Sequence, residues 1–285
     1  MNAALRAPTV EDLPEVLRLM SQSAPEPVQA DDVRLMWSSP GFDVAEDARL
    51  DGDAYAQLEH FGEGRVWIDV RGRPSAAILD WAEERAREKG HRLICGGWSS
   101  NEDLLPELRR RGYELVRHSH RMGMDLGDPT PEPDWPEGID VRSFQPGDAR
   151  AFYEAQQESF ADSWEPVEET FERWSHWLLE TPAFDPELWF LASEGAETAG
   201  FAVCIRRSGD PETAIVRLLG VRGPWRRRGL GRALLLHAFG EFRRRGFRRA
   251  SLGVDAESLT GAHKLYESVG MHVERRFDIY EKPTS

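Results

Sequence analysis

The two halves of this chain begin with the same short pattern, and this internal repeat limits the folds open to it. Residues 5–12 (LRAPTVED) and residues 141–148 (VRSFQPGD) each read as a short strand followed by a turn that ends in aspartate. When the two arginines are superposed, Asp12 falls on Asp148. Self-similarity at so long a spacing indicates a duplicated domain rather than a solenoid of short repeats. We expect each aspartate to cap the helix that follows it.

The later parts of the two halves match as well. Residues 108–116 (LRRRGYELV) resemble residues 266–274 (YESVGMHVE). Between the halves, residues 127–138 (GDPTPEPDWPEG) are rich in proline, glycine and acid and lack hydrophobic periodicity, which is typical of a linker. The chain has 285 residues, which is enough for two cores of ordinary size. We therefore expect two domains, residues 1–126 and residues 139–285.

The second half alternates strand and helix patterns. Apolar residues recur at helical spacing after Gly229, whereas short apolar runs bounded by turn signals read as strands. The patterns predict an α/β fold with a mixed sheet and packed helices, present as two tandem copies. The expected strands are at about 139–144, 188–193, 198–206, 214–221, 249–254 and 272–281, and the expected helices at about 148–161, 167–180, 229–245 and 262–269.

Composition and charge argue against several classes of protein. No apolar run is long enough to span a bilayer, and the N-terminus has no basic start followed by an apolar stretch, so we expect a cytoplasmic protein with no membrane partner. The net charge is −14, with 16 basic and 24 acidic side chains in residues 1–128 and 20 and 26 in residues 129–285. Neither half has the excess of basic residues that is typical of a nucleic-acid-binding protein.

The two cysteines show no pattern of a metal site or a disulfide. Cys95 and Cys204 lie in apolar stretches without metal-ligand spacing, so we expect two buried thiols, no disulfide and no metal.

The strongest chemical signal lies in residues 218–234 (LLGVRGPWRRRGLGRAL). An apolar strand ends in a proline-containing turn, and residues 226–231 (RRRGLG) lead into a long helix. The first amides of a helix have no partner within it and lie at the positive end of its dipole, while glycines let a phosphate approach the backbone and arginines add charged donors. The segment therefore predicts an anion site. Leu234 stands where a dinucleotide fingerprint needs a third glycine, and Gly231 is followed by Arg-Ala rather than the Lys-Ser or Lys-Thr of a Walker loop.

In this context the RRRGLG loop resembles the pyrophosphate-binding loop of GNAT acetyltransferases, which also lies after a strand and before a helix. Residues 261–271 (GAHKLYESVGM) resemble the terminal helix of that family, and the strand at 251–255 (SLGVD) lies between the two motifs at the expected distance. The resemblance covers about residues 139–282. With its two halves, the whole chain resembles the tandem-GNAT group that includes mycothiol synthase-like proteins.

The resemblance implies an acetyl-CoA-dependent N-acetyltransferase in which the amine of a small molecule attacks the thioester directly. It implies that loop amides hold the pyrophosphate and that the end of the preceding strand pairs with the pantetheine arm as an added strand. Tyr266 would protonate the departing thiolate, and its alternative role is that of a packed helix aromatic. The cofactor-binding residues expected on this basis are Leu219, Gly220, Val221, Arg226, Arg227, Arg228, Gly229, Leu230, Gly231, Arg232, Ser258 and Ala262.

The catalytic base is less clearly marked. The family often uses a glutamate on or near the strand before the loop, or a chain of waters. Glu212 lies just before that strand and Glu158 lies on the first helix of this half, although exposed glutamates are mostly solvated. An asparagine that the family often has before the terminal helix is missing here, and Ser258 or Thr260 is its possible substitute.

The first half departs from the family's pattern. An offset of 156 residues places Arg73 and Ser75 under the two loop glycines, and Pro74 between them has no N–H to donate. At the terminal helix, Leu108 falls where Tyr266 lies in the second half. We therefore expect the first half to be a degenerate copy with a structural or regulatory role, and weak binding of a CoA-like ligand there stays open.

Aromatic residues gather in the first two helices of the second half, which shape the acceptor pocket in this family. They fit a pocket for a cationic amine on an apolar body. The alternative is that Trp174 and Trp177, three residues apart, form a core stripe. We expect His176 and His237, which have no clustered partners, to be packed or surface residues. The group comprises Phe160, Trp164, Trp174, His176 and Trp177, with Glu158, Asp162 and Glu165 nearby.

Two other functions stay open at this point. The same loop fits a sensor that binds acyl-CoA and passes the signal through the degenerate half, and it also fits an acetyltransferase for a protein N-terminus or lysine. A hydrolase is disfavoured because the chain has no G-x-S-x-G nucleophile elbow. Two tandem domains are compatible with a monomer that mimics a dimer.

Overall fold

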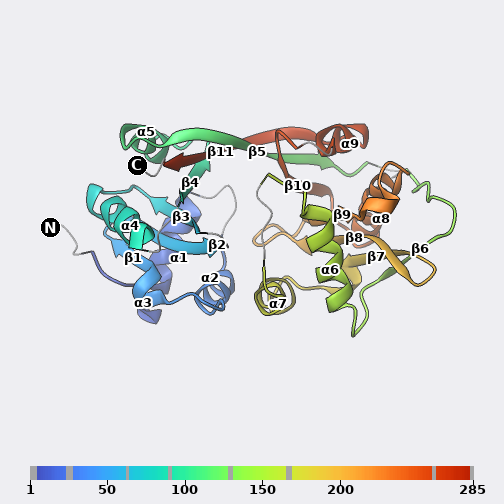
Figure 1. Cartoon of the computed structure of the whole chain (residues 1–285), viewed down its shortest axis with the longest axis horizontal. Coiled ribbons are helices and arrows are strands. Elements are labelled where there is room, and N and C mark those ends of the chain that lie inside the picture. Colours follow the sequence, from blue (N-terminus) through green and yellow to red (C-terminus); the bar gives the residue numbers. More distant parts are fainter. Residues whose placement is uncertain are drawn as a thin grey trace. The chain divides into compact units, whose positions relative to one another are not determined.

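The chain forms two compact units in its computed structural model (Figure 1). The first unit comprises Met1–Ser119, Leu179–Pro182 and Arg276–Ser285, and the second comprises His120–Leu178 and Ala183–Arg275. Strand β5 (Glu114–Asp125) therefore begins in the first unit and ends in the second, and strand β11 (His272–Lys282) does the reverse. The structure describes residues 5–23, 28–61, 64–88, 92–127, 131–164, 169–258 and 261–282.

In the first unit the strands follow the order β1-β2-β3-β4-β11. Strand β3 pairs with β4 in parallel, and the other neighbouring pairs are antiparallel. Val66, Ile68 and Val70 of β3 alternate with less buried residues and pack on α4, as a half-buried strand requires. The elements of this unit are η1 (Val10–Asp12), α1 (Leu13–Ser23), α2 (Ala30–Trp37), α3 (Val44–Asp47), β1 (Ala48–Asp51), β2 (Ala54–Phe61), β3 (Arg65–Gly72), α4 (Ala76–Glu88), β4 (Arg92–Trp98) and α5 (Leu104–Arg110).

In the second unit the strands follow the order β10-β9-β8-β7-β6. Strands β6 to β9 are antiparallel neighbours, and β10 joins β9 in parallel. The elements are β6 (Ile139–Ser143), α6 (Ala149–Phe160), α7 (Phe171–Leu179), η2 (Pro186–Leu188), β7 (Trp189–Glu194), β8 (Glu197–Arg206), β9 (Thr213–Val221), η3 (Gly223–Trp225), α8 (Leu230–Arg244), β10 (Arg249–Asp255) and α9 (Ala262–Ser268).

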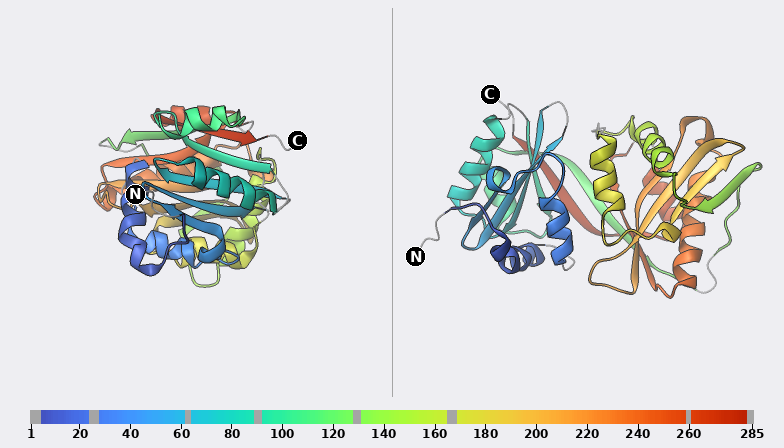
Figure 2. Two further views of the ribbon diagram at one scale, coloured as in Figure 1. Left: turned by 90° about the vertical axis from the view of Figure 1, so that its left-hand side faces the viewer. Right: turned by 90° about the horizontal axis from the view of Figure 1, so that it is seen from below.

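The two faces of the second sheet are covered by different helices. Ala202 and Val216 pack in one core cluster with Leu234 of α8. Phe201, the strand neighbour of Ala202, has its ring 5.9 Å from the ring of Phe152 on α6. Because side chains alternate along a strand, α8 covers one face and α6 covers the other, on the same side as α7 (Figure 2).

These elements confirm the mixed α/β fold expected from the sequence. The strands and helices expected in residues 139–285 are all present, because their apolar periodicity is local information that folding preserves. The helix expected from residue 167 begins at Phe171, and residues 165–168 lie outside the described ranges.

The repeated Arg–Asp pattern forms the same ion pair in both units. Arg6 binds Asp12 at 2.7 and 2.5 Å, and Arg142 binds Asp148 at 2.6 and 2.9 Å. The expectation that Asp148 caps the following helix is wrong, because its side chain makes no capping hydrogen bond. The carboxylate of Asp148 instead accepts from Arg142 and from the N–H of Gln145. A bidentate pair with a guanidinium is stronger than one bond from a neutral amide.

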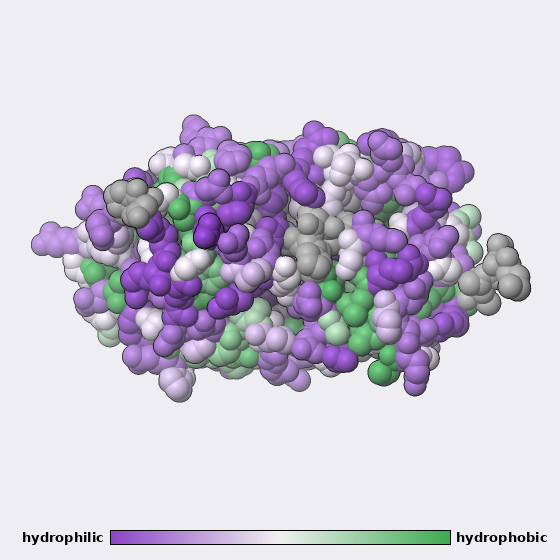
Figure 3. Space-filling view, turned by 180° about the vertical axis from the view of Figure 1, so that it is seen from behind, coloured by the Kyte–Doolittle hydropathy of each residue, from purple (hydrophilic) through white to green (hydrophobic). Residues whose placement is uncertain are grey.

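The two cysteines are buried thiols. Neither Cys95 nor Cys204 forms a disulfide, and burial raises the pKa of both. Within the described ranges, no helix is long and apolar enough to cross a membrane. Hydrophilic side chains dominate the face shown in Figure 3, with apolar side chains scattered among them.

Candidate active site

Strand β9 loses one of its neighbours halfway along its length. The parallel ladder with β10 covers only four residue pairs, from Thr213↔Arg249 to Val216↔Leu252. On the other side, β8 pairs with β9 to its end, and the register shifts by one residue at Arg217, between the pairs Cys204↔Val216 and Val203↔Leu218. Such a bulge bends and twists a strand. The last residues of β9, including the predicted Leu219–Val221, therefore have a strand neighbour on one side only in this ladder.

Gly220 lies in the part of β9 that β10 does not pair. A Cβ on this residue would come within 2.3 Å of the ring of Phe201 and 3.0 Å of the hydroxyl of Ser159. No side chain fits between the strand and these two groups. Gly220 thus keeps the backbone of β9 closely packed beneath α6.

The loop after β9 makes a tight turn into α8. Trp225 is buried, and its indole N–H donates to Glu194 at 2.7 Å. Arg227 has φ of 62° and Gly229 has φ of 88°, both in the left-handed region. This conformation costs a non-glycine residue roughly 1–2 kcal/mol, and such strain persists mainly where the surrounding structure imposes it.

The backbone N–H groups at the start of α8 are unused. In the described part of the chain, no hydrogen bond engages the N–H groups of residues 227–232. The first turn of α8 also contains no acidic residue that would offset the positive end of its dipole. A helix of 15 residues with free first amides behind a glycine turn is a ready site for a phosphate group.

The arginines of the loop divide into two groups. The guanidinium of Arg226 donates to the carbonyls of Val221 (3.1 Å) and Ser159 (3.0 Å) and to Asp162 (3.0 Å), so it ties the loop to α6. Arg228 pairs with Glu194 at 3.1 Å. The side chains of Arg227 and Arg232 are exposed and have no ion-pair partner among the described residues. They are the cations left to meet an anion at this helix start.

Helix α9 packs directly on this helix start. A Cβ on Gly231 would lie 3.3 Å from Leu265, so the two helices nearly touch there. Tyr266 is 8% exposed, and burial raises the pKa of its phenol to about 12. Its hydroxyl has no hydrogen-bond partner in the described ranges. Tyr266 is therefore a protonated donor on α9, next to the Leu265 that contacts the start of α8.

The residues before Tyr266 link β10 to α9. The N–H of Ser258 donates to the carbonyl of Asp255 at 3.2 Å in the turn after β10. Ala262 opens α9 and packs against the core cluster that contains Leu230 of α8. Thr260, the other predicted donor of this segment, lies outside the described residues.

The two predicted base residues lie in different places. Glu158, on α6, accepts from Arg222 (2.6 Å) and from the N–H of Gly223 (3.3 Å), so its carboxylate holds the start of the loop. Glu212 precedes β9 and pairs with Arg248 at 3.2 Å. The nine-residue strand between Glu212 and the loop spans about 26 Å. The structure therefore places Glu158 at the loop and Glu212 at the opposite end of β9.

The predicted aromatic group divides between the core and more exposed positions, because Trp174 and His176 are buried whereas Phe160 and Trp177 are half-buried. Trp174 is fully buried and donates to Gln156 at 2.8 Å, as the core alternative predicts. His176 is also buried, and His237 packs against Phe190 with ring centroids 4.7 Å apart. Trp164 is 38% exposed. Glu165 lies outside the described residues.

The sequence reasoning missed Glu169, which directly precedes the Thr170 that caps α7. Its side chain is 17% exposed. Burial raises the pKa of this carboxyl group, while Arg173 and Arg217 partly oppose the rise. No local pattern distinguishes Glu169 from the other acids of its segment, since its burial comes from the packing of α6, α7 and β9.

The corresponding helix start in the first unit is closed. The hydroxyl of Ser75 accepts from the N–H of Ile78 at 3.2 Å and donates to the carboxylate of Asp51. The preceding Pro74 has no N–H. The amides that are free in α8 are therefore partly used or missing in α4.

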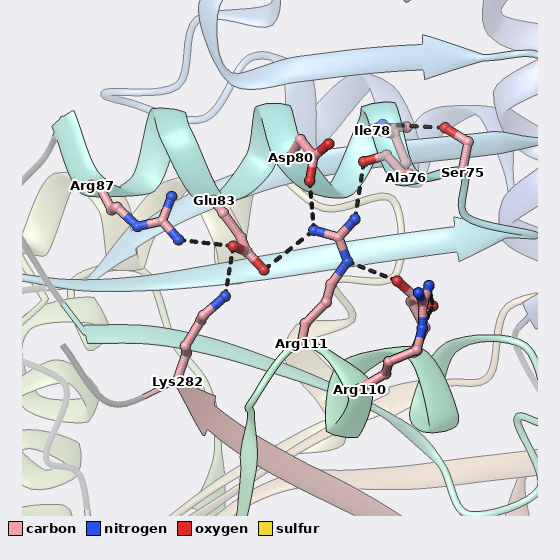
Figure 4. Close-up of polar contacts among 10 residues, drawn as sticks. Ser75, Ala76, Ile78, Asp80, Glu83, Arg87, Arg110, Arg111 and Lys282 are labelled. Carbon is pink, nitrogen blue, oxygen red and sulfur yellow. Dashed lines mark hydrogen bonds and ion pairs between the residues drawn. The ribbon is translucent and has the colours of Figure 1, made fainter. Parts of the chain in front are cut away.

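Ion pairs also lock α4 to the end of α5 (Figure 4). Arg111 donates to the carbonyl of Ala76 at 3.1 Å and to Asp80 at 2.7 Å. The buried Glu83 lies 3.6 Å from Arg111 and accepts from Lys282 at 2.7 Å. A charged network thus joins α4 to the end of α5 in the first unit, whereas α9 meets α8 through the apolar contact of Leu265.

Comparison with known proteins agrees with this geometry. Residues 149–271 match the acetyltransferase (GNAT) family. The chain is 36% identical over 239 residues to a mycothiol acetyltransferase from Thermobispora bispora, covering 77% of each chain. It is 32% identical over 288 residues to a mycothiol acetyltransferase from Geodermatophilus obscurus, covering 94% of this chain and 88% of the relative.

Solved structures show the same architecture. The crystal structure of a GCN5-related N-acetyltransferase from Sphaerobacter thermophilus has a TM-score of 0.77 at 32% identity, and the match covers 98% of this chain and 95% of that one. A tandem GNAT protein from the clavulanic acid biosynthesis pathway has a TM-score of 0.71 at 16% identity, with 100% and 99% covered. At that identity the second likeness supports the tandem fold alone.

Proposed function

Since this chain belongs to the GNAT acetyltransferase family and is an N-acetyltransferase, we propose that its second unit transfers the acetyl group of acetyl-CoA to the amine of a small molecule. One observation carries this assignment to the second unit. The free amides of residues 227–232 come after one short turn, η3, from the strand end that β10 leaves unpaired. A pyrophosphate and an extended pantetheine arm need those two features side by side.

The residues of the second unit divide the work between binding and chemistry. We assign pyrophosphate binding to the amides of residues 227–231, helped by the exposed Arg227 and Arg232, and pantetheine pairing to Leu219–Val221. Acetyl-CoA supplies the activated acyl group. Tyr266 donates its proton to the sulfur as the C–S bond breaks, because its buried phenol is protonated at neutral pH.

Arg226 and Glu158 have positioning roles in this proposal. Both side chains join the loop to α6, Arg226 through Ser159 and Asp162 and Glu158 through Arg222. They hold the loop in the conformation that turns its amides outward. Glu212 has no part in the chemistry proposed here, because it lies at the far end of β9.

We further propose that the first unit is a degenerate copy with a structural role. Ser75 and Pro74 leave α4 fewer free amides than α8, and Leu108 replaces the catalytic tyrosine. Acetyl-CoA should therefore bind with a stoichiometry of one per chain.

The acceptor class rests on the relatives. Two of them are named mycothiol acetyltransferases, which supports a small-molecule amine over a protein N-terminus or lysine. Titration calorimetry with acetyl-CoA tests binding, and thiol release from acetyl-CoA tests turnover. The acceptor panel should contain small amines, amino acids, unacetylated mycothiol and lysine-containing peptides. Turnover with peptides alone would favour protein acetylation, binding without turnover would favour a sensor, and absence of binding would refute the cofactor site.

A further inference from the structure

The acids around the proposed site differ in how tightly they are already paired. Glu158 is held at 2.6 Å by Arg222, Asp162 at 3.0 Å by Arg226 and Glu194 at 3.1 Å by Arg228. These carboxylates are occupied by charge-assisted hydrogen bonds within the protein. They are thus committed to holding the loop and are poorly suited to receive a substrate.

Glu169 is different. Its side chain is 17% exposed, yet its ion-pair partner Arg173 lies 3.6 Å away, which is beyond hydrogen-bonding distance. No described residue donates a closer hydrogen bond to this carboxylate, and a largely buried carboxylate in that situation is costly to keep ionised. An amine entering beside Glu169 would supply that donor.

The backbone of Glu169 is fixed in place by its neighbours. The hydroxyl of Tyr153 on α6 donates to the carbonyl of Glu169 at 2.7 Å. Thr170 then caps α7, since its hydroxyl accepts from the N–H of Arg173 at 3.2 Å. The backbone that carries the Glu169 side chain is therefore held by hydrogen bonds to α6 and to the start of α7.

Glu169 is linked to β9 through Arg217, which acts on it electrostatically. Leu219 and Val221 pack against the core cluster that contains Leu234 of α8, so their side chains lie on the α8 face of β9. Gly220, between them, lies toward Ser159 of α6 on the other face. Arg217 is two residues before Leu219, where the strand end assigned to pantetheine begins, so Glu169 lies within electrostatic reach of the residue that leads into that strand end.

We propose that Glu169 binds the acceptor's amine and takes the proton that the nitrogen loses as it attacks the acetyl carbon. The N–C bond forms, the C–S bond breaks, the amine's proton passes to Glu169, and the sulfur takes a proton from Tyr266. Both groups regain their starting states by exchange with solvent. This assignment rests on the proposed acetyl transfer and adds the acceptor side of the same site.

The charged groups that act on Glu169 are Arg173 on α7 and Arg217 on β9, and Tyr153 on α6 is its uncharged polar neighbour. Both arginines favour the ionised carboxylate, which is the form that can accept a proton.

The test compares Glu169→Gln with Glu172→Gln, an exposed acid in the first turn of α7. With the best acceptor of the panel, kcat/KM should fall about 10²–10⁴-fold in E169Q and stay within about twofold of the wild type in E172Q. Acetyl-CoA affinity by calorimetry should be unchanged in both variants. The acidic limb of the wild-type pH profile should disappear in E169Q, and Arg217→Gln should move that limb to higher pH, since the arginine's charge lowers the pKa of Glu169.

The outcomes separate this inference from the proposed function. A wild-type protein that releases thiol with an amine while E169Q keeps the same rate and the same acidic limb overturns the role of Glu169 alone. A lower rate in E169Q with the limb intact also overturns it, because it shows a structural effect. A wild-type protein that binds no acetyl-CoA, or turns over no acceptor, overturns the acetyl transfer on which the inference depends.

Discussion

Replacing Tyr266 with phenylalanine removes one oxygen atom from a well-packed position. The side chain is 8% exposed and its hydroxyl makes no hydrogen bond within the described ranges, so the change leaves no other group unsatisfied. The pKa of the phenol is about 12, and about one molecule in 10⁵ is therefore ionised at pH 7. The wild type has the proton available in nearly every molecule, and the variant has none to give.

The expected loss is confined to the chemical step. A positioned general acid contributes about 10²–10⁴ in rate, which corresponds to about 2.7–5.4 kcal/mol of transition-state stabilisation. We expect kcat to fall by that factor in Tyr266→Phe. The acetyl-CoA affinity should stay within about twofold, and the free energy of unfolding within about 0.5 kcal/mol, because no packing contact is lost.

Thiol release at saturating acetyl-CoA and acceptor measures kcat, calorimetry measures affinity, and urea unfolding measures stability. Tyr113→Phe is the matched control, because Tyr113 is also a buried tyrosine, 5% exposed, whose pKa is raised by burial but which belongs to the first unit. Its variant should keep the wild-type kcat. Equal turnover by Tyr266→Phe and the wild type would refute the acid role.

Three further substitutions test the loop and the repeated ion pair. Gly231→Trp should abolish acetyl-CoA binding in calorimetry, because the ring would cover the free amides. The free energy of unfolding in urea should fall by about 1–3 kcal/mol, because the ring meets Leu265. Unchanged affinity would contradict the phosphate site. Gly229→Ala should cost about 1–2 kcal/mol of stability in urea unfolding from its φ of 88°, since the new methyl group meets open space; no loss would contradict the strain argument. Asp148→Asn should cost about 0.5–1 kcal/mol at pH 7, a small value because Arg142 is partly solvent-exposed. The arginine lowers the pKa of Asp148, so this stability is present above the unfolded pKa of about 3.9 and is lost as the pH falls through the lower folded value; chemical unfolding that shows the same difference at pH 7 and at pH 2 would argue against the ion pair.

The position of the loop proposed to bind the pyrophosphate was predictable because the sequence signals that form it are local. An apolar strand, a proline turn, two glycines and a helical apolar repeat follow one another within residues 218–234. Each of these signals acts over a few residues, so the strand, the turn and the helix form where the pattern places them. The same holds for the repeat of Arg6 and Asp12 at Arg142 and Asp148. Both aspartates bind arginine, and Asp12 also accepts from the N–H of Thr9 in the capping box of η1, whereas Asp148 does not cap α6.

The roles of individual charged residues were not predictable in this way. Arg226 belongs to the loop motif, but its guanidinium contacts α6, some 65 residues earlier in the chain. Glu212 precedes β9, and the length of that strand places it far from the loop. Glu158 lies at the loop, where its carboxylate is paired with Arg222. Such contacts depend on which elements meet in space.

The sequence by itself determined the order of strands and helices, the duplication and the helix start that can receive a phosphate, because periodicity, glycine and proline act through neighbouring residues. Only the tertiary structure decided that α9 meets that helix start through Leu265, next to the buried Tyr266. It also decided that the first unit closes its own helix start with Ser75, and that Glu169 is half-buried with its ion-pair partner 3.6 Å away. Burial and pairing are properties of elements brought together across the sheet, and the residues that create them lie far apart in the chain.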